Sequence, residues 1–349
     1  MQLNLMWTEL REAVRHFDLV RRSGLGAVRI TADSGSQACR VETHDTDRLV
    51  STQIKADVAA DGSAVVPAQP FHDFVRACDT EQGHLTMSED RLQLDAAESR
   101  ITLRCFDLDV WPQRTHLETD AAEWSPTVLS VLGRVIHAVS DDLARPALTG
   151  IQLRDGWAAA TDSRRLAAAE VPAPPATDIV VPGDVVRSVL RLAASAGCSV
   201  RTSDREITFA VGETYITTSL ILDAFPDWRI AFPSSPLHQL TFDRRGLLQA
   251  LQRLAVIASR ADLGTVLISQ GGDDRLVLRA RVPDIGEQED HVAGTMTMDA
   301  VAFGRAFLAD LAAACHEDSM TLRADSPHKV FSVEEADFRA LLTPIEARR

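Results

Sequence analysis

The chain has 349 residues, with 36 lysines and arginines against 50 aspartates and glutamates and a formal charge of −14. Apolar residues make up 45% of the chain and charged residues 25%, a composition typical of folded proteins and not of disordered ones. No apolar run approaches the ~20 residues of a membrane-spanning helix, and the N-terminal residues lack the pattern of a secretory signal. The five cysteines are scattered and never form a C-x-x-C pair, which argues against a zinc or disulfide framework and predicts a cytoplasmic protein. On net charge alone, a nucleic-acid binder is disfavoured, because phosphate contacts need lysine or arginine.

Apolar periodicity predicts six helices, over residues 7–22, 68–78, 125–140, 183–196, 243–260 and 299–314. Strands are predicted between the helices, and in the middle of the chain they cover 150–153, 157–161 and 166–171 and the alternating runs 199–202, 206–211 and 214–220. Two proline-rich segments, 172–175 and 233–236, predict a loop and an interdomain linker.

An internal repeat organises these elements. The helical patterns that open at Trp7, Ser125 and Phe242 are spaced by 118 and 117 residues. The sequence V-V-P recurs at residues 65 and 180, a related stretch begins at residue 297, and prolines close the units at 112, 226 and 344. The repeat predicts three domains of one α+β fold, at 1–117, 118–236 and 237–349, each with two helices and two antiparallel sheets.

The charge is distributed unevenly over the predicted elements. The six helices contain thirteen arginines and eight acidic residues, which leaves about +5 on the helices and −19 on the rest of the chain. Arginine is a good helix former, so a solvated helix face would explain any single helix. Repeated over six helices, the pattern instead predicts a basic face that meets a polyanion. The arginines that we expect on this basic face are Arg21, Arg22, Arg76, Arg134, Arg187, Arg191, Arg245, Arg253 and Arg305.

Three short motifs identify a known family. The chain reads A-T-D-S-R-R-L-A from Ala160, F-P-D-W-R from Phe225 and L-L-T-P-I up to Ile345. Together they resemble the bacterial DNA polymerase III β subunit, the sliding clamp, and the resemblance covers essentially the whole chain. A fainter copy of the first motif, H-D-T-D-R-L, begins at His44, 117 residues before Thr161.

The resemblance implies a head-to-tail homodimer that closes a six-domain ring around double-stranded DNA, with helices lining the hole. Such a ring holds DNA without reading bases, because phosphate contacts are independent of sequence. It tethers DNA polymerase and the clamp loader, needs no cofactor and catalyses no reaction. The implied protein is therefore a non-enzymatic processivity factor, cytoplasmic and associated with the nucleoid, with no membrane partner.

The resemblance also implies two contact sites. A pocket for short hydrophobic peptide motifs of polymerases and the loader would use Leu148, Thr161, Ser163, Arg164, Arg165, Leu166, Pro226, Ile230, Ala231, Thr343, Pro344 and Ile345. Small and apolar walls would bury the peptide's anchors, while Arg165 would offer a fixed donor. The dimer interface would use Ile101, Leu103, Ile257 and Ala258.

Several positions depart from the family pattern. The usual turn T-D-G-H-R-L reads T-D-S-R-R-L here, and an arginine common after F-P-D-Y-R is Ile230. The usual ending M-P-[MV]-R-L begins at Thr343, which puts Glu346 at the place of its arginine. These changes favour a divergent clamp, and leave open a specialised paralogue or mobile-element clamp with altered partner selectivity.

An alternative from another class is a metal-dependent DNA-processing hydrolase. The cluster His44-Asp45-x-Asp47 could start a metal site, but the further ligands that such sites need are missing from the pattern. The pairs Asp141-Asp142 and 273–274 are not repeated in the other units, so solvated loop acids explain them better. No G-x-S-x-G elbow, Walker loop or Rossmann fingerprint occurs, so we predict no catalytic and no metal-binding residues.

Overall fold

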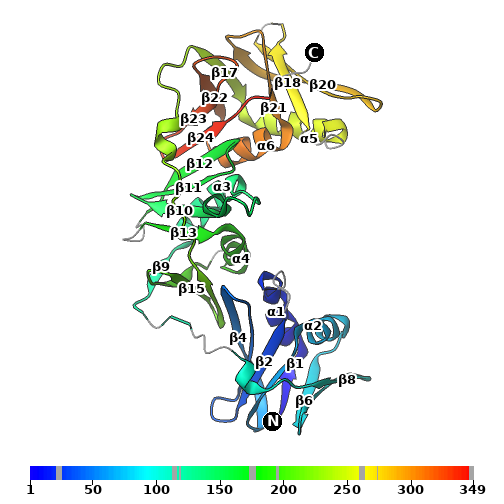
Figure 1. The fold of residues 1–349 in the computed structure, drawn as a ribbon. Helices are drawn as coiled ribbons and strands as arrows, with labels where there is room; N and C mark the ends of the chain where they lie inside the picture. Colours follow the sequence, from blue (N-terminus) through cyan, green and yellow to red (C-terminus); the bar gives the residue numbers. More distant parts are fainter. Residues whose placement is uncertain are drawn as a thin grey trace. The chain divides into compact units, whose positions relative to one another are not determined.

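The computed structural model describes residues 1–20, 26–111, 116–117, 119–172, 178–193, 196–258, 264–272 and 274–345 (Figure 1). Within these residues the chain forms helices and antiparallel strands in one order that occurs three times, which confirms the predicted α+β class. The order in each repeat is strand, helix and three strands, followed by the same five elements again.

The bounds of the elements show this repetition. The first repeat has β1 Gln2–Met6, α1 Trp7–Arg15, β2 Ala27–Asp33, β3 Ala38–His44, β4 Arg48–Ala60, β5 Gly62–Pro67, α2 Ala68–Ala77, β6 Gln82–Ser88, β7 Arg91–Ala96 and β8 Ser99–Arg104. The second has β9 Ala122–Trp124, α3 Pro126–Val135, β10 Gly150–Arg154, β11 Trp157–Thr161, β12 Arg165–Glu170, β13 Ile179–Pro182, α4 Gly183–Ala193, β14 Cys198–Thr202, β15 Glu206–Val211 and β16 Thr214–Ser219. The third has β17 His238–Asp243, α5 Arg244–Ala258, β18 Thr265–Gln270, β19 Arg275–Val282, β20 Gly286–Met296, β21 Ala300–Gly304, α6 Arg305–Ala314, β22 Ser319–Ala324, β23 Phe331–Glu334 and β24 Phe338–Leu342.

The helices predicted at 7–22, 125–140 and 299–314 extend beyond the α-helices observed within the described residues, and the short strand before each of the six helices was missed. The helix predicted from residue 299 begins at Arg305, because Ala300–Gly304 pairs with β18 as β21. The first helix ends at Arg15 and continues as the 3₁₀ turn His16–Leu19. Short apolar runs fit a strand and a helix equally well, so periodicity alone misassigned these segments.

The strands of the described residues form two twelve-stranded sheets. The first contains the order β8-β7-β6-β1-β4-β16-β15-β14-β9, with β2, β3 and β5 joined through β4. The second has the order β13-β10-β11-β12-β24-β23-β22-β17-β20-β19-β18-β21. Each sheet therefore crosses a boundary between repeats, through the antiparallel pairs β4–β16 and β12–β24.

Packing divides the chain differently from the repeat. One compact unit consists of Met1–Leu129 and Asp184–Leu220, and the other of Ser130–Gly183 and Ile221–Arg349. The division falls inside the middle repeat, because each half of that repeat shares a sheet with a neighbouring repeat. The boundaries at 117 and 236 describe the sequence repeat and stay predictions as domain limits.

Each unit buries large side chains between its sheet and its helices. Helices α1 and α2 contact each other in the first unit, as α5 and α6 do in the second (Figure 1). Trp7 is fully buried, and its indole N–H donates to the carbonyl of Val75 at 3.1 Å. Phe242, Phe303 and Phe331 are fully buried in the second unit. None of the described helices has the length and apolar character needed to span a membrane.

Candidate functional site

The turn between β11 and β12 is built by side chains of the T-D-S-R-R-L motif. The carboxylate of Asp162 accepts hydrogen bonds from the backbone N–H groups of Arg164 and Arg165, at 2.8 and 2.9 Å. The hydroxyl of Thr161 donates to the carbonyl of Arg165 at 2.7 Å and accepts from the N–H of Ser163 at 3.2 Å. An aspartate that ties down the following backbone is the ordinary chemistry of a tight turn, so the motif has a structural role of its own.

The fainter motif of the first repeat forms the same turn between β3 and β4. The carboxylate of Asp45 accepts from the N–H groups of Asp47 and Arg48, at 2.8 and 2.7 Å. His44 pairs with Leu49 across this turn, in the register that joins residue 161 to residue 166 in the second repeat. The motif is thus repeated in structure as well as in sequence. Asp45 therefore stabilises the turn. The ring of His44 packs edge-on against that of Trp111, with ring centroids 4.5 Å apart.

The second-repeat turn contacts the C-terminal segment of the chain. The N–H of Thr343 donates to the carbonyl of Arg164 at 2.9 Å, directly beyond the paired strands β12 and β24. The N–H of Ile345 donates to the carbonyl of Ala302 at 2.8 Å, and Pro344 between them is half-buried. Four of the predicted peptide-site residues, at 161, 163, 164 and 343, therefore lie together, while Glu346 lies outside the described residues.

Arg165, which we expected to offer a fixed donor, is held in place by ion pairs within the protein. Its guanidinium donates to Asp162 at 3.0 Å and to Asp310 at 2.6 Å, and it lies over the ring of Phe307 at 4.2 Å. Burial lowers the pKa of nearby His137 to about 4, and the charge of Arg165 lowers it further while Asp310 opposes the shift. Arg165 thus ties the turn to α6.

The other predicted peptide-site residues differ in exposure. Leu166 belongs to a core cluster with Trp228 and Leu341, and Leu148 is buried as well. The segment Trp228–Ala231 is a 3₁₀ turn that Asp227 caps by accepting from the N–H of Arg229. Ile230 and Ala231 are exposed on this segment, as is Pro226 just before it, and Ile230 has 82% of its surface accessible. Leu148 and Leu166 therefore support the surface, and the exposed residues form part of it.

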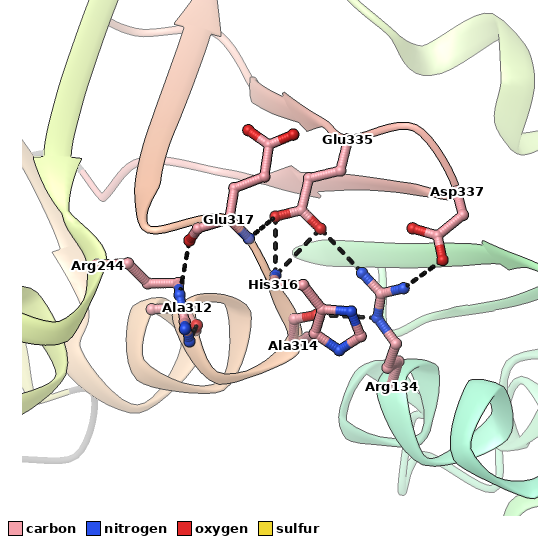
Figure 2. Close-up of polar contacts among 8 residues, drawn as sticks. All are labelled: Arg134, Arg244, Ala312, Ala314, His316, Glu317, Glu335 and Asp337. Carbon is pink, nitrogen blue, oxygen red and sulfur yellow. Dashed lines mark hydrogen bonds and ion pairs between the residues drawn. The ribbon is translucent and has the colours of Figure 1, made fainter. Parts of the chain in front are cut away.

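Arg134 does not lie on a DNA-facing surface. It is 7% exposed, and Figure 2 shows its guanidinium between Glu335 and Asp337, which it reaches at 2.9 and 3.0 Å. Its Nε atom also donates to the carbonyl of Ala314 at 3.0 Å, at the end of α6. A buried and fully engaged guanidinium cannot contact phosphate, which removes Arg134 from the predicted set. The partners lie about 200 residues away in sequence, so no local signal pointed to them.

The remaining arginines of that set fall into four groups. Arg76, Arg191 and Arg245 are exposed and form no ion pair within the described residues. Arg253 is exposed but makes a bidentate ion pair with Asp290, at 2.6 and 2.9 Å, which neutralises its charge. Arg187 and Arg305 are half-buried. Residues 21 and 22 lie outside the described residues.

The predicted dimer residues also differ in exposure. Strand β8 is an edge of the first sheet, where Ile101 is half-buried and Leu103 is buried in its own unit. On α5, Ile257 is half-buried and Ala258 is buried. Sequence reasoning missed Val256, which is 70% exposed on the same helix. The helical periodicity could have found it, because the buried stripe through Leu247, Leu251 and Leu254 leaves residue 256 on the outer face.

Asp142, of the acidic pair at 141–142, has a structural role. Asp142 pairs with Arg145 at 3.0 Å, and a backbone bond from Ala144 together with this pair lowers its pKa. Among the residues that the structure describes, no group of three or more His, Cys, Asp and Glu side chains could hold a metal ion. Residue 273 lies outside them.

Comparison with known proteins agrees with the architecture. Residues 125–227 match the family model of the central domain of the DNA polymerase III β subunit. A β sliding clamp from Synechococcus elongatus is 25% identical over 93% of this chain and 92% of its own length, and one from Caulobacter vibrioides is 27% identical over 71% of each. Among solved structures, a sliding clamp from Bartonella birtlesii bound to griselimycin has a TM-score of 0.86 at 20% identity, covering 99% of this chain and all of its own. The sliding clamp from Bacillus subtilis has a TM-score of 0.85 at 17% identity and covers both chains fully. The three-fold repeat and the turn motif agree with these similarities: the chain has the fold of the bacterial β sliding clamps, and its middle repeat matches the central domain of the DNA polymerase III β subunit.

Proposed function

We propose that this chain is a DNA sliding clamp, a ring without catalytic activity that encircles duplex DNA and tethers DNA polymerase for processive synthesis. The observation that carries the proposal is the similarity to β sliding clamps over 93% of the chain, combined with the three-fold repeat. Acting on DNA would associate the protein with the nucleoid in the cytoplasm.

The ring would be a head-to-tail homodimer of six repeats. The open edge of β8 supports this, because an unpaired strand edge offers backbone groups to a second chain. Ile101 on that edge and Val256 with Ile257 on α5 supply the exposed or half-exposed apolar contacts. We expect a dimer at micromolar concentration by light scattering, and a monomer for Ile101→Asp. A monomeric wild-type chain would refute the ring. Leu103→Asp is a poor test, because this buried side chain also supports the fold.

The DNA contacts would come from the helices. In their observed bounds, the helices hold ten arginines against five acidic residues, so the excess of about +5 remains, while a dimer carries −28 in total. Segregated charge of this kind repels DNA from the acidic surface and concentrates it at the basic one. We expect Arg245→Ser to lower the salt dependence of DNA association by about one phosphate contact. Arg253→Ser is the matched control on the same helix, because Asp290 already neutralises that arginine.

Topology gives the decisive experiment. After loading with the organism's clamp loader, a ring should stay on circular DNA and slide off the same DNA once it is linearised. Equal retention on both forms would mean ordinary binding and would refute the clamp. A screen for nuclease and phosphatase activity with Mg²⁺ or Mn²⁺ tests the hydrolase alternative, and we expect no activity.

Partner proteins would bind through short hydrophobic peptides at the surface around residues 161–166, 226–231 and 343–345. Ile230 favours a second candidate, a specialised clamp with altered partners, because an 82% exposed isoleucine replaces a charged residue with an apolar contact. A synthetic peptide with the clamp-binding motif of bacterial polymerases tests this. Weak binding that improves in Ile230→Arg supports a specialised clamp, and binding as tight as that of a housekeeping clamp contradicts it.

A further inference from the structure

Two joints between neighbouring repeats are built in the same way. We call a joint the place where a strand of one repeat pairs with the last strand of the next, as β4 does with β16 and β12 with β24. At each joint, a backbone N–H at the end of the last strand also donates to the turn that precedes the other strand. Ser219 donates to the carbonyl of Asp47 and Thr343 to the carbonyl of Arg164, both at 2.9 Å. The two joints within the chain therefore have equivalent backbone contacts.

An arginine adds an ion pair to each joint. Arg48 and Arg165 are the first residues of β4 and β12, 117 positions apart. Arg48 pairs with Asp184 on α4 at 2.8 Å, and Arg165 pairs with Asp310 on α6 at 2.6 Å. Each of these helices is the second helix of the following repeat, so each ion pair connects a turn to the helix beyond the joint. The two arginine side chains are 20% and 13% exposed, so solvent screens the pairs only in part.

The third repeat has the corresponding hairpin without this arginine. The turns of the first two hairpins have four residues, 45–48 and 162–165, and the arginine is the last of them. The turn between β19 and β20 has three, because Val282 pairs with Gly286. Its residues 283–285 read P-D-I. The position that holds an arginine in both other repeats is therefore missing from this one.

The hairpin of the third repeat has no following repeat in its own chain. In the proposed ring, the following repeat is the first repeat of a second copy, whose last strand β8 is a sheet edge. Residues 286–291 of β20 pair on one side only, with β19, in the part of the chain that the structure describes. Helix α2 of the second copy would take the place of α6. Asp73 is the sixth residue of α2, as Asp310 is of α6, and its side chain is 59% exposed. The acid of the ion pair is thus present for this joint, while the arginine is missing.

We propose that the arginine–aspartate pair holds the two joints within the chain closed, and that the joint with a second copy lacks it and is the one that opens. A closed ring has to open to admit DNA that has no free end. An ion pair across a joint must break before its strands separate, so a joint without the pair opens more readily. This inference rests on the proposed ring function of the chain.

The first test adds the missing arginine. Inserting an arginine between Ile285 and Gly286 gives the turn its fourth residue and places an arginine last, as in the other hairpins. The matched control inserts a serine at the same place. We expect the arginine variant to form a dimer about fivefold tighter than the serine variant in subunit-exchange measurements, the upper end for a partly exposed ion pair. Its rings should also leave circular DNA about fivefold more slowly. Adding Asp73→Asn should remove the gain.

The second test weakens a joint that has the pair. Asp184→Asn removes the charge that Arg48 contacts and keeps an acceptor for the N–H of Val185. We expect the amide of Ser219, which donates across this joint, to exchange its hydrogen about fivefold faster. Amides of β7, in the same unit, should not change. Glu9→Gln is the matched control, because Glu9 is an exposed acid in the first turn of α1.

Three results would overturn the proposal. The first is an inserted arginine that tightens the dimer no more than the inserted serine, and the second is a gain that persists in Asp73→Asn. The third is a Ser219 amide whose exchange Asp184→Asn leaves unchanged. A dimeric wild-type chain with any of these results keeps the ring and loses only this inference. A monomeric wild-type chain refutes the ring itself, and the assignment of its opening joint with it.

Discussion

Arg134→Met tests whether the buried ion pair holds the second unit together. The substitution keeps a long apolar side chain that can still pack on Phe338, over which the guanidinium lies at 4.5 Å. It removes three donated hydrogen bonds, to Glu335, Asp337 and the carbonyl of Ala314 (Figure 2). Packing therefore changes little, and the experiment isolates the charge.

The expected loss of stability comes mainly from leaving the Glu335 carboxylate without its partner. This carboxylate is 7% exposed and would keep only the N–H groups of His316 and Glu317, at 2.8 and 3.0 Å. Removing one partner from a buried ion pair costs about 3–5 kcal/mol, because the other charge stays buried and uncompensated. Asp337 is 56% exposed and can return to water at little cost. Adding Glu335→Gln removes the stranded charge but keeps an acceptor for both N–H groups, so the double variant should recover about 1–3 kcal/mol.

Native-state hydrogen exchange is the appropriate assay, since two compact units need not unfold together. Amides of β24, which pair with β12 and β23, report the second unit, and amides of β15 report the first. The control is Arg245→Met, an exposed arginine that should change stability by less than about 0.5 kcal/mol. A loss below about 1 kcal/mol in Arg134→Met, or a double variant no more stable than the single one, would refute the reasoning.

Two further predictions concern stability. The folded-state pKa of His137 is about 4, below its ordinary 6.5 because of burial, so the unfolded chain takes up the proton first as pH falls. Stability should therefore decrease as the pH falls from 6.5 to 4, by at most about 1.4 kcal/mol per pH unit. Thermal melts of His137→Gln should show a shallower decrease, and an unchanged slope of stability against pH would contradict this. In Gly83→Ala, the new Cβ would stand 2.2 Å from a ring carbon of Trp7, so overpacking should cost about 1–3 kcal/mol in urea unfolding. Gly133 lies on α3, and a Cβ added there would have no atom within 4 Å, so Gly133→Ala should stabilise the protein by up to about 1 kcal/mol. An equal loss of stability in both alanine variants would refute the packing argument.

Local patterns in the sequence predicted the strands of the middle repeat closely. The stretch 157–161 is observed as β11 with the same limits, and 206–211 as β15. The stretch 206–211 alternates polar and apolar residues, and both segments are bounded by turn residues, so their signal is contained in a few neighbouring residues. Residues 299–304 had no such boundary, and their strand was assigned to the following helix. Only its pairing with β18 distinguishes the two assignments.

The parts of the candidate site that depend on neighbouring residues were predicted, and the parts that depend on distant ones were not. The Asp162 turn follows from its motif, since an aspartate bonds to backbone two and three residues ahead. The restraint of Arg165 by Asp310 and the burial of Arg134 depend on residues 145 and about 200 positions away. No spacing rule reaches such partners, so both arginines were indistinguishable in sequence from solvent-facing ones.

The sequence by itself determined the repeat, the α+β class and the excess of arginine on the helices. These features are local or periodic, and each repeat carries its own copy of them. The tertiary structure decided which strands cross from one repeat to the next, which arginines keep an accessible charge, and where the backbone takes a left-handed turn at Ser163. The net charge of a helix follows from its own residues. Which of those charges reach the surface depends on burial and pairing, and these involve chain segments that meet only after folding.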